Sequence, residues 1–202
     1  MALCQSGRLG RPRSYRHSLG KMKRRNLMTG FLALGIALAT AAIVSAQSLE
    51  WMLVNWKVRH DFPNVRRISP EEVAQWLKDS KRAQPVLLDV RTKAEFDVSH
   101  IHGARRIEPG SAANAIDLAR DTPIVTYCSV GYRSGAFAKK LQDAGYQNVE
   151  NMSGSIFQWA NEGRPVERAG QRVEKVHPYD ARWGKLLKPS LRADVPPAGK
   201  GM

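Results

Sequence analysis

Cysteine is scarce in this sequence: only Cys4 and Cys128 occur among its 202 residues. If the mature chain lacks its first residues, Cys128 is the sole cysteine and no intramolecular disulfide can form. A free cysteine is often a small buried hydrophobic residue, but it can also be a reactive thiol. The residues around Cys128 therefore indicate whether this cysteine has a packing role or a chemical one.

Acidic residues are absent from positions 1–49, which carry eight of the 32 Lys and Arg residues. More than half of the formal net charge of +14 therefore belongs to this N-terminal part. The remaining residues mix both signs, as a solvated surface does, and they contain no basic stripe interleaved with aromatic residues. These patterns argue against nucleic-acid binding.

A long uncharged apolar stretch, residues 27–46, follows the basic segment 21–25. The basic start, the apolar run and the small residues before Gln47 are typical of a signal peptide. The stretch is also long enough, at about 20 residues, to remain as a membrane anchor. Both interpretations place the rest of the chain outside the cytoplasm, periplasmic or anchored to the membrane, because the basic flank tends to stay inside. An organelle transit peptide is the alternative interpretation of the basic leader.

Shifts in composition divide the chain into five predicted segments. The first is basic, without periodicity and typical of disorder, and Met22 is a plausible true start of the protein. The segments are the leader (1–21), the signal peptide or membrane anchor (22–46), a helical linker (47–64), the folded domain (65–168) and a C-terminal extension (169–202).

The two segments that flank the domain carry apolar residues at regular positions. In the linker, the spacing of these residues predicts a helix that packs on the domain or lies at a membrane interface. The linker residues at helical spacing are Leu49, Met52, Leu53 and Trp56. The residues of the extension expected to pack back on the domain are Tyr179, Trp183, Leu186 and Leu187.

Strand and helix patterns alternate within the predicted domain. The short apolar runs at residues 85–90 and 123–127 are typical of buried strands, and residues 148–152 are a third candidate. Such an alternation predicts an α/β fold with a mainly parallel sheet flanked by helices. The functional site of this kind of domain lies at the carboxyl ends of its strands.

Helices are predicted between these strands. Ser69, Pro70 and Glu72 form a capping box with proline at the first helical position, which indicates that a helix begins there. The other predicted helices span residues 111–120, 134–145 and 155–163.

Cys128 comes directly after the predicted strand 123–127, and a helical pattern restarts near Ser134. The residues between them must curl around the sulfur, and Gly131 permits the tight backbone. Their N–H groups and the start of the helix would surround the sulfur with partial positive charge, which lowers the pKa of a thiol. Arg133 adds a full charge that can hold an anionic substrate. Cys128 is therefore a candidate nucleophile, whereas Ser134 is expected to cap the helix.

Three motifs of this chain, in this order, resemble those of the rhodanese family: LLDVRTKAEFDVSHIHGA, YCSVGYRS and NMSGSIFQWANEGRPV. The resemblance implies a rhodanese-like domain, and a single-domain thiosulfate sulfurtransferase of the exported bacterial type. In that activity Cys128 attacks the outer sulfur of a small anionic donor such as thiosulfate, and sulfite leaves. The persulfide formed on Cys128 then passes its sulfur to cyanide or a thiol. No cofactor is expected.

The resemblance also implies roles for the residues around Cys128. The predicted substrate-binding residues are Ser129, Val130, Gly131, Tyr132 and Arg133. The predicted supporting residues are Asp89, Arg91 and Ser134, of which the first two are expected to brace the loops as an ion pair. Glu95 and His100 are interpreted as structural. His100 and His102 have no third ligand near them in sequence, so no metal is expected.

Loop length bears on the kind of chemistry. Phosphatases related to this family have a larger loop of the form C-x5-R, whereas Cys128 and Arg133 define the shorter C-x4-R form, which fits one sulfur atom. The count argues against a phosphatase. The main alternative is a non-catalytic rhodanese-like module that senses sulfur or binds a protein.

Overall fold

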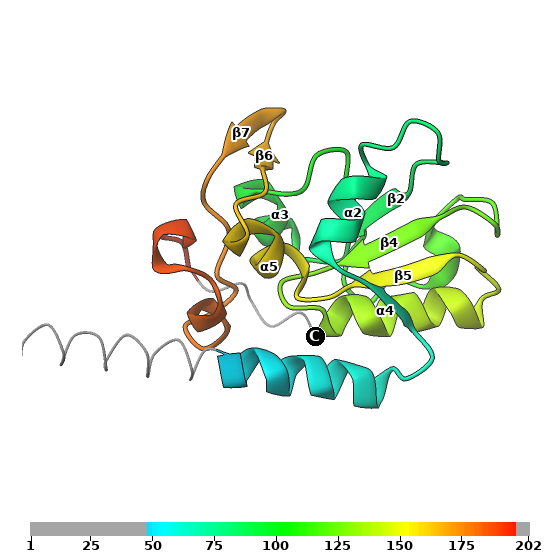
Figure 1. Ribbon diagram of the computed structural model, residues 1–202, viewed down its shortest axis with the longest axis horizontal. Coiled ribbons are helices and arrows are strands. Elements are labelled where there is room, and N and C mark those ends of the chain that lie inside the picture. The colour runs from blue at the N-terminus through cyan, green and yellow to red at the C-terminus, as the bar shows by residue number, and fades with distance from the viewer. Residues whose placement is uncertain (1–47, 197–202) are drawn as a thin grey trace, which may run out of the picture. The chain divides into compact units, whose positions relative to one another are not determined.

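Five parallel strands form the central sheet, in the order β1-β5-β4-β2-β3 (Figure 1). The computed structural model describes residues 48–196. The strands are β1 (Arg66–Ile68), β2 (Val86–Asp89), β3 (Arg105–Arg106), β4 (Ile124–Tyr127) and β5 (Val149–Met152). All four pairings are parallel, as the sequence predicts, and the three predicted strands correspond to β2, β4 and β5.

Helices cover both faces of the sheet (Figure 1). They are α2 (Pro70–Trp76), α3 (Lys93–Val98), α4 (Tyr132–Asp143), α5 (Ser155–Asn161) and an N-terminal helix over residues 48–61. The core has two parts, because successive strand residues point to opposite faces. Leu87 and Val125 pack with α2 and α5, whereas Leu88 and Ile124 pack with α4. This three-layer arrangement buries the strands on both sides and leaves their ends free to carry a site.

The start of α2 confirms the capping box. Glu72 donates its backbone N–H to the Ser69 hydroxyl, and the Glu72 carboxylate accepts from the Ser69 N–H at 2.8 Å. Pro70 occupies the first turn, where its missing N–H costs no hydrogen bond. A similar box formed by Thr92 and Glu95 opens α3.

The prediction of a helix over residues 111–120 is wrong. Only a short 3₁₀ turn, Ala113–Ala115, forms there, and Ile116 is already extended. The carbonyl of Ile116 accepts a hydrogen bond from the Tyr146 hydroxyl at 3.0 Å. This tertiary contact and the burial of Ile116 fix the segment across the sheet face in place of a helix.

The C-terminal extension packs on the domain as predicted. The last residues of the predicted domain form β6 (Val166–Arg168), which pairs with β7 (Gln171–Val173) of the extension, and 3₁₀ turns follow at Trp183–Leu186 and Pro189–Leu191. Leu186 and Leu187 are buried in the core part that contains α2 and α5.

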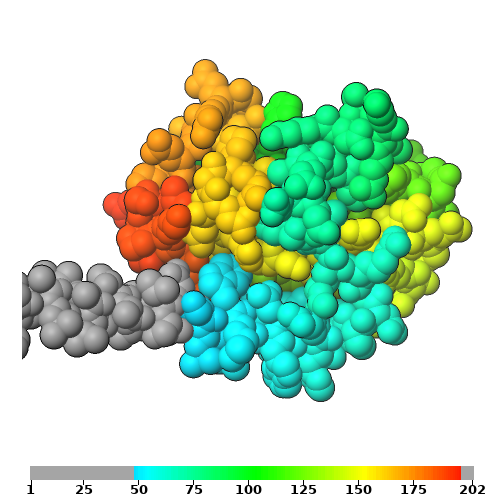
Figure 2. Space-filling model, viewed as in Figure 1, coloured from blue at the N-terminus to red at the C-terminus, as the bar shows by residue number. Residues whose placement is uncertain are grey.

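The N-terminal helix has two apolar sides. Trp51 and Val54 pack against the core, but the opposite side stays exposed. In Figure 2 this helix, in cyan, lies at the surface. The predicted leader and the signal peptide or anchor lie outside the described residues. Between residues 48 and 196, no helix is both long and apolar enough to cross a membrane.

Candidate functional site

Cys128 lies at the carboxyl end of β4, where the sequence places the site. The residue is only 1% exposed, yet it lines a pocket of about 470 Å³. The other lining residues are Val54, Lys57, Ser129, Val130, Tyr132, Arg133, Tyr179, Arg182 and Trp183. The thiol is therefore at the bottom of an opening large enough for a small substrate.

The loop after Cys128 curls around the sulfur. Gly131 adopts φ 106°, which a residue with a side chain rarely tolerates, and its N–H donates to Cys128 Sγ at 3.1 Å. The Cys128 N–H donates to Ser155 Oγ at 3.1 Å, and the Cys128 carbonyl accepts from the Ile156 N–H. The loop is thus fixed by β5 and α5 as well as by its own turn.

Ser134 does not cap α4, contrary to the sequence prediction. The helix begins two residues earlier, at Tyr132, with Gly131 as a cap that has no side chain. Ser134 is instead fully buried in the first turn, with its hydroxyl 3.5 Å from Cys128 Sγ and 2.7 Å from Asn151 Oδ1. Its single hydroxyl hydrogen can go to the sulfur or to the amide oxygen. The earlier helix start therefore makes Ser134 a neighbour of the sulfur.

Asn151 connects the two groups that contact the sulfur. Its Oδ1 accepts from Ser134, and its Nδ2 donates to the Gly131 carbonyl at 2.9 Å. Contacts at hydrogen-bond distance thus connect Cys128 Sγ, Ser134, Asn151 and Gly131 in one network, in which Ser134 donates to either the sulfur or Asn151. The sequence prediction missed Asn151, for which the only signal was its position within the third predicted strand.

Arg133 is held by Glu95, which the sequence suggested only as a structural residue. The guanidinium donates to both carboxylate oxygens at 2.8 and 2.7 Å, and Ser129 Oγ donates to Glu95 at 2.8 Å. Burial raises the pKa of the Glu95 carboxyl, but the hydrogen bonds and charge of Arg133 outweigh it and lower the pKa to about 2. Glu95 therefore stays ionised and fixes Arg133 at the pocket wall.

The environment of Cys128 favours the thiolate. Burial raises the pKa of the thiol, but the charge of Arg133 and hydrogen bonds from Ser134 and Gly131 oppose burial and leave the pKa below its ordinary value. A thiolate is the nucleophilic form of cysteine. The arrangement can therefore hold a negative charge on sulfur, or on a second sulfur atom attached to it, without an adjacent general base.

Replacing Arg133 with glutamine tests this electrostatic effect. The variant loses the largest contribution that lowers the Cys128 pKa, so the midpoint of alkylation by iodoacetamide is expected to move to higher pH. Arg168→Gln, which removes an exposed charge on β6, is the matched control and should leave the profile unchanged. An unshifted profile in Arg133→Gln would show that the hydrogen bonds from Ser134 and Gly131, and not the charge of Arg133, lower the thiol pKa.

Asp89 and Arg91 form a fully buried ion pair below the site. Arg91 Nη2 lies 2.7 Å from Asp89 Oδ2 and also donates to the Ser99 carbonyl at 2.6 Å. Neither residue lines the Cys128 pocket. The pair connects the end of β2 to the segment after α3, the helix that carries Glu95.

The extension supplies part of the pocket wall, which the sequence did not predict. The Arg133 guanidinium lies 4.9 Å from the centre of the Tyr179 ring, a cation–π geometry. Tyr179 has a strained φ of 66°, and its N–H donates to His177 Nδ1 at 3.0 Å. Arg133 is thus confined between Glu95 and Tyr179.

The two histidines considered as metal ligands both contact Glu167. His102 Nδ1 lies 2.7 Å from a Glu167 oxygen, and His100 stacks on Phe96. Within residues 48–196, no group of three or more His, Cys, Asp or Glu residues could hold a metal ion.

Fold and site together define a class of protein: a parallel α/β domain that presents a cysteine thiolate in a cradle of backbone N–H groups. Residues 69–162 match the family model of the Rhodanese-like domain, so the chain contains a rhodanese-like domain, as the three motifs predicted. The matched residues lie within the predicted domain, 65–168.

Curated relatives match about half of the chain. The chain is 33% identical over 102 residues to the probable adenylyltransferase/sulfurtransferase MoeZ of Mycobacterium tuberculosis, covering 48% of this chain and 25% of that protein. It is 33% identical over 123 residues to the tRNA uridine(34) hydroxylase of Listeria welshimeri, covering 57% and 37%. The chain thus spans only between 25% and 37% of the length of these relatives.

Solved structures also align with about half of the chain. A rhodanese-related protein from Thermoplasma volcanium is 28% identical with a TM-score of 0.44, covering 50% of this chain and 97% of that chain. A rhodanese-like domain protein from Staphylococcus aureus is 23% identical with a TM-score of 0.46, covering 52% and 100%.

Proposed function

We propose that this protein is a sulfurtransferase that carries sulfane sulfur on Cys128. In the first step the Cys128 thiolate attacks the outer sulfur of thiosulfate. A sulfur–sulfur bond forms to Cys128, the sulfur–sulfur bond of thiosulfate breaks, and sulfite leaves with its electron pair. In the second step cyanide or a thiolate attacks the outer sulfur of the persulfide, and the Cys128 thiolate is regenerated.

The observation that carries this proposal is the cradle around the sulfur. The Gly131 N–H points at Cys128 Sγ from 3.1 Å, and the charge of Arg133 lowers the thiol pKa. Donors that stabilise the thiolate also stabilise the negative charge of a persulfide, because both anions lie at the same loop. Donors arranged in advance lower the energy of the anion without reorganisation at the moment of reaction.

The pocket supports an anionic donor. Arg133, Lys57 and Arg182 line it; Arg133 is paired with Glu95 and Lys57 with Asp61, so the net positive charge of the lining rests mainly on Arg182. Such a lining attracts a doubly charged donor such as thiosulfate and excludes no neutral or anionic thiol acceptor. The proposed acceptor is a thiol, and cyanide is a convenient acceptor for an assay.

Intact mass measurement tests both steps. Wild type incubated with thiosulfate is expected to gain one sulfur atom and to lose it on addition of cyanide, with formation of thiocyanate. Cys128→Ala is expected to gain nothing. If no adduct forms with thiosulfate or other sulfane sulfur donors, the enzyme proposal fails, and a rhodanese-like binding or sensing module takes its place.

We further propose that the protein is exported and works at a membrane surface. The apolar stretch 27–46 ends just before the N-terminal helix, whose outer side carries four large exposed hydrophobic residues. They are Leu49, Met52, Leu53 and Trp56, with exposed fractions between 51% and 61%. A helix that is apolar on both sides is unfavourable in water, and a bilayer interface would cover the outer side.

Vesicle binding tests the membrane proposal. The chain from Gln47 onward is expected to co-sediment with vesicles of phosphatidylglycerol, and Leu53→Glu/Trp56→Glu is expected to weaken binding by roughly tenfold or more. Gln147→Glu/Gln171→Glu adds the same charge at two exposed positions and is the matched control. Equal binding of both double variants would show that the N-terminal helix does not contact the membrane.

A further inference from the structure

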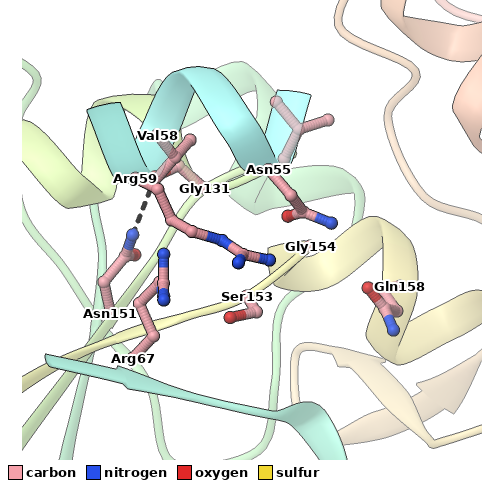
Figure 3. A pocket seen from close by; sticks show the side chains of 10 residues that line it. Asn55, Val58, Arg59, Arg67, Gly131, Asn151, Ser153, Gly154 and Gln158 are labelled. Atoms are coloured by element: carbon pink, nitrogen blue, oxygen red, sulfur yellow. Dashed lines mark hydrogen bonds between the residues drawn. The ribbon is translucent and has the colours of Figure 1, made fainter. Parts of the chain in front are cut away.

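A second pocket lies against the cysteine loop, with Gly131 in its wall (Figure 3). Its volume is about 160 Å³, and only Val130 lines both this pocket and the one that contains Cys128. The other lining residues are Asn55, Val58, Arg59, Arg67, Gly131, Asn151, Ser153, Gly154 and Gln158. They come from the N-terminal helix, β1, the cysteine loop, the end of β5 and α5.

Two arginines in this pocket have no acidic partner. Figure 3 shows the Arg59 and Arg67 side chains reaching into the same space from opposite elements. Across residues 48–196, neither guanidinium forms an ion pair with a carboxylate, and no acidic residue lines the pocket. Burial and the neighbouring charge of Arg59 both lower the pKa of Arg67. Both side chains are exposed, so solvent screens the repulsion between the two charges, and an anion between them would reduce what remains of it.

Neutral polar groups complete the pocket. Asn55, Ser153 and Gln158 each bring an amide or hydroxyl group to its wall (Figure 3). The Gln158 side chain lies directly over the Gly154 backbone, because a Cβ atom on Gly154 would come within 2.1 Å of Gln158 Oε1. Glycine at this position thus allows the amide of Gln158 to lie at the pocket rim.

We propose that this pocket binds a tetrahedral oxyanion of the phosphate and sulfate class. Guanidinium groups match such anions in charge and geometry, since each can donate two parallel N–H bonds to neighbouring oxygens. The Ser153 hydroxyl can provide a further donor, whereas the Gln158 amide already donates to Glu162 Oε1 at 2.9 Å. This assignment stands apart from the proposed sulfur transfer, because its charged residues do not contact Cys128.

The position of the pocket connects it to the cysteine loop. Its wall includes Gly131 and Asn151, two residues of the hydrogen-bond network around Cys128 Sγ. A bound anion adds negative charge behind the loop, which disfavours the thiolate. Occupancy is therefore expected to move the alkylation profile of Cys128 to higher pH, provided that Arg59 and Arg67 are intact.

Titration with inorganic phosphate, followed by NMR, tests the site directly. The expected result is a saturable shift of the Arg59 and Arg67 Nε–H signals and of the Gln158 side-chain amide. Arg59→Gln/Arg67→Gln is expected to weaken phosphate binding by roughly tenfold or more. Arg168→Gln/Arg172→Gln, which removes the same charge from two exposed positions of the β6–β7 hairpin, should bind as wild type does.

Vesicles distinguish a free anion from a lipid phosphate. If phosphate moves the pocket signals, a free oxyanion binds. If only phosphatidylglycerol vesicles bind, and only Arg59→Gln/Arg67→Gln weakens that binding, the same site takes a headgroup phosphate. The assignment is overturned if neither ligand moves the Arg59, Arg67 and Gln158 signals, or if the control double variant loses as much affinity. The wild-type signals decide this even if a variant fails to fold.

Discussion

Cys128→Ser is expected to lower thiosulfate sulfurtransferase activity by more than about 10³-fold, because the proposed reaction passes through a covalent bond to this sulfur. Serine is close to cysteine in size, and its hydroxyl oxygen can accept the hydrogen bonds that Gly131 and Ser134 donate to the sulfur. The loop should therefore retain its shape, and the loss should be chemical. Thiocyanate formation from thiosulfate and cyanide is the measurement.

The second cysteine of the chain offers a matched control for this variant. Cys4→Ser makes the same chemical change in the basic leader and is expected to leave the rate unchanged. The thermal midpoint of Cys128→Ser should stay close to that of wild type, because the replaced side chain is small and Gly131 and Ser134 lie within hydrogen-bond distance of it. Residual activity of Cys128→Ser within tenfold of wild type would exclude a persulfide on this residue.

The sequence predicted the parts of the fold that depend on local pattern. β2 and β4 are short apolar runs buried on both faces, and the capping box at Ser69 specifies the start of α2 by contacts three residues apart. The position of Cys128 at the end of β4 follows from the same pattern. These features depend on residues close together in the sequence, and the structure confirms them.

Features that depend on distant contacts could not be predicted in this way. β1 is only three residues long and pairs with β5, about 84 residues later, so its own sequence shows little strand pattern. Arg133 is paired with Glu95, 38 residues before it, and Asn151 is recruited to the sulfur from another strand. The failure at Ser134 has the same origin, since Asn151 and the sulfur compete with the helix end for its hydroxyl.

Asp89→Ala is expected to lower the free energy of unfolding by about 3–5 kcal/mol, the largest stability effect in this domain. Asp89 and Arg91 are both fully buried, and removal of the carboxylate leaves a guanidinium that stays charged at any working pH. Asp89 contacts both Nε and Nη2, whereas Arg91 Nη1 has no hydrogen-bond partner within the described residues. Urea unfolding monitored by tryptophan fluorescence measures the loss.

A double variant separates the charge from the packing. Asp89→Leu/Arg91→Met removes both charges, and it is expected to recover much of the stability that Asp89→Ala loses, because two apolar side chains avoid the cost of an isolated charge. If the double variant is as unstable as Asp89→Ala, the hydrogen bond from Arg91 to the Ser99 carbonyl, and not the charge balance, holds this region. Either result has consequences for the site, since the segment that Arg91 fixes follows α3, and α3 carries the carboxylate that positions Arg133.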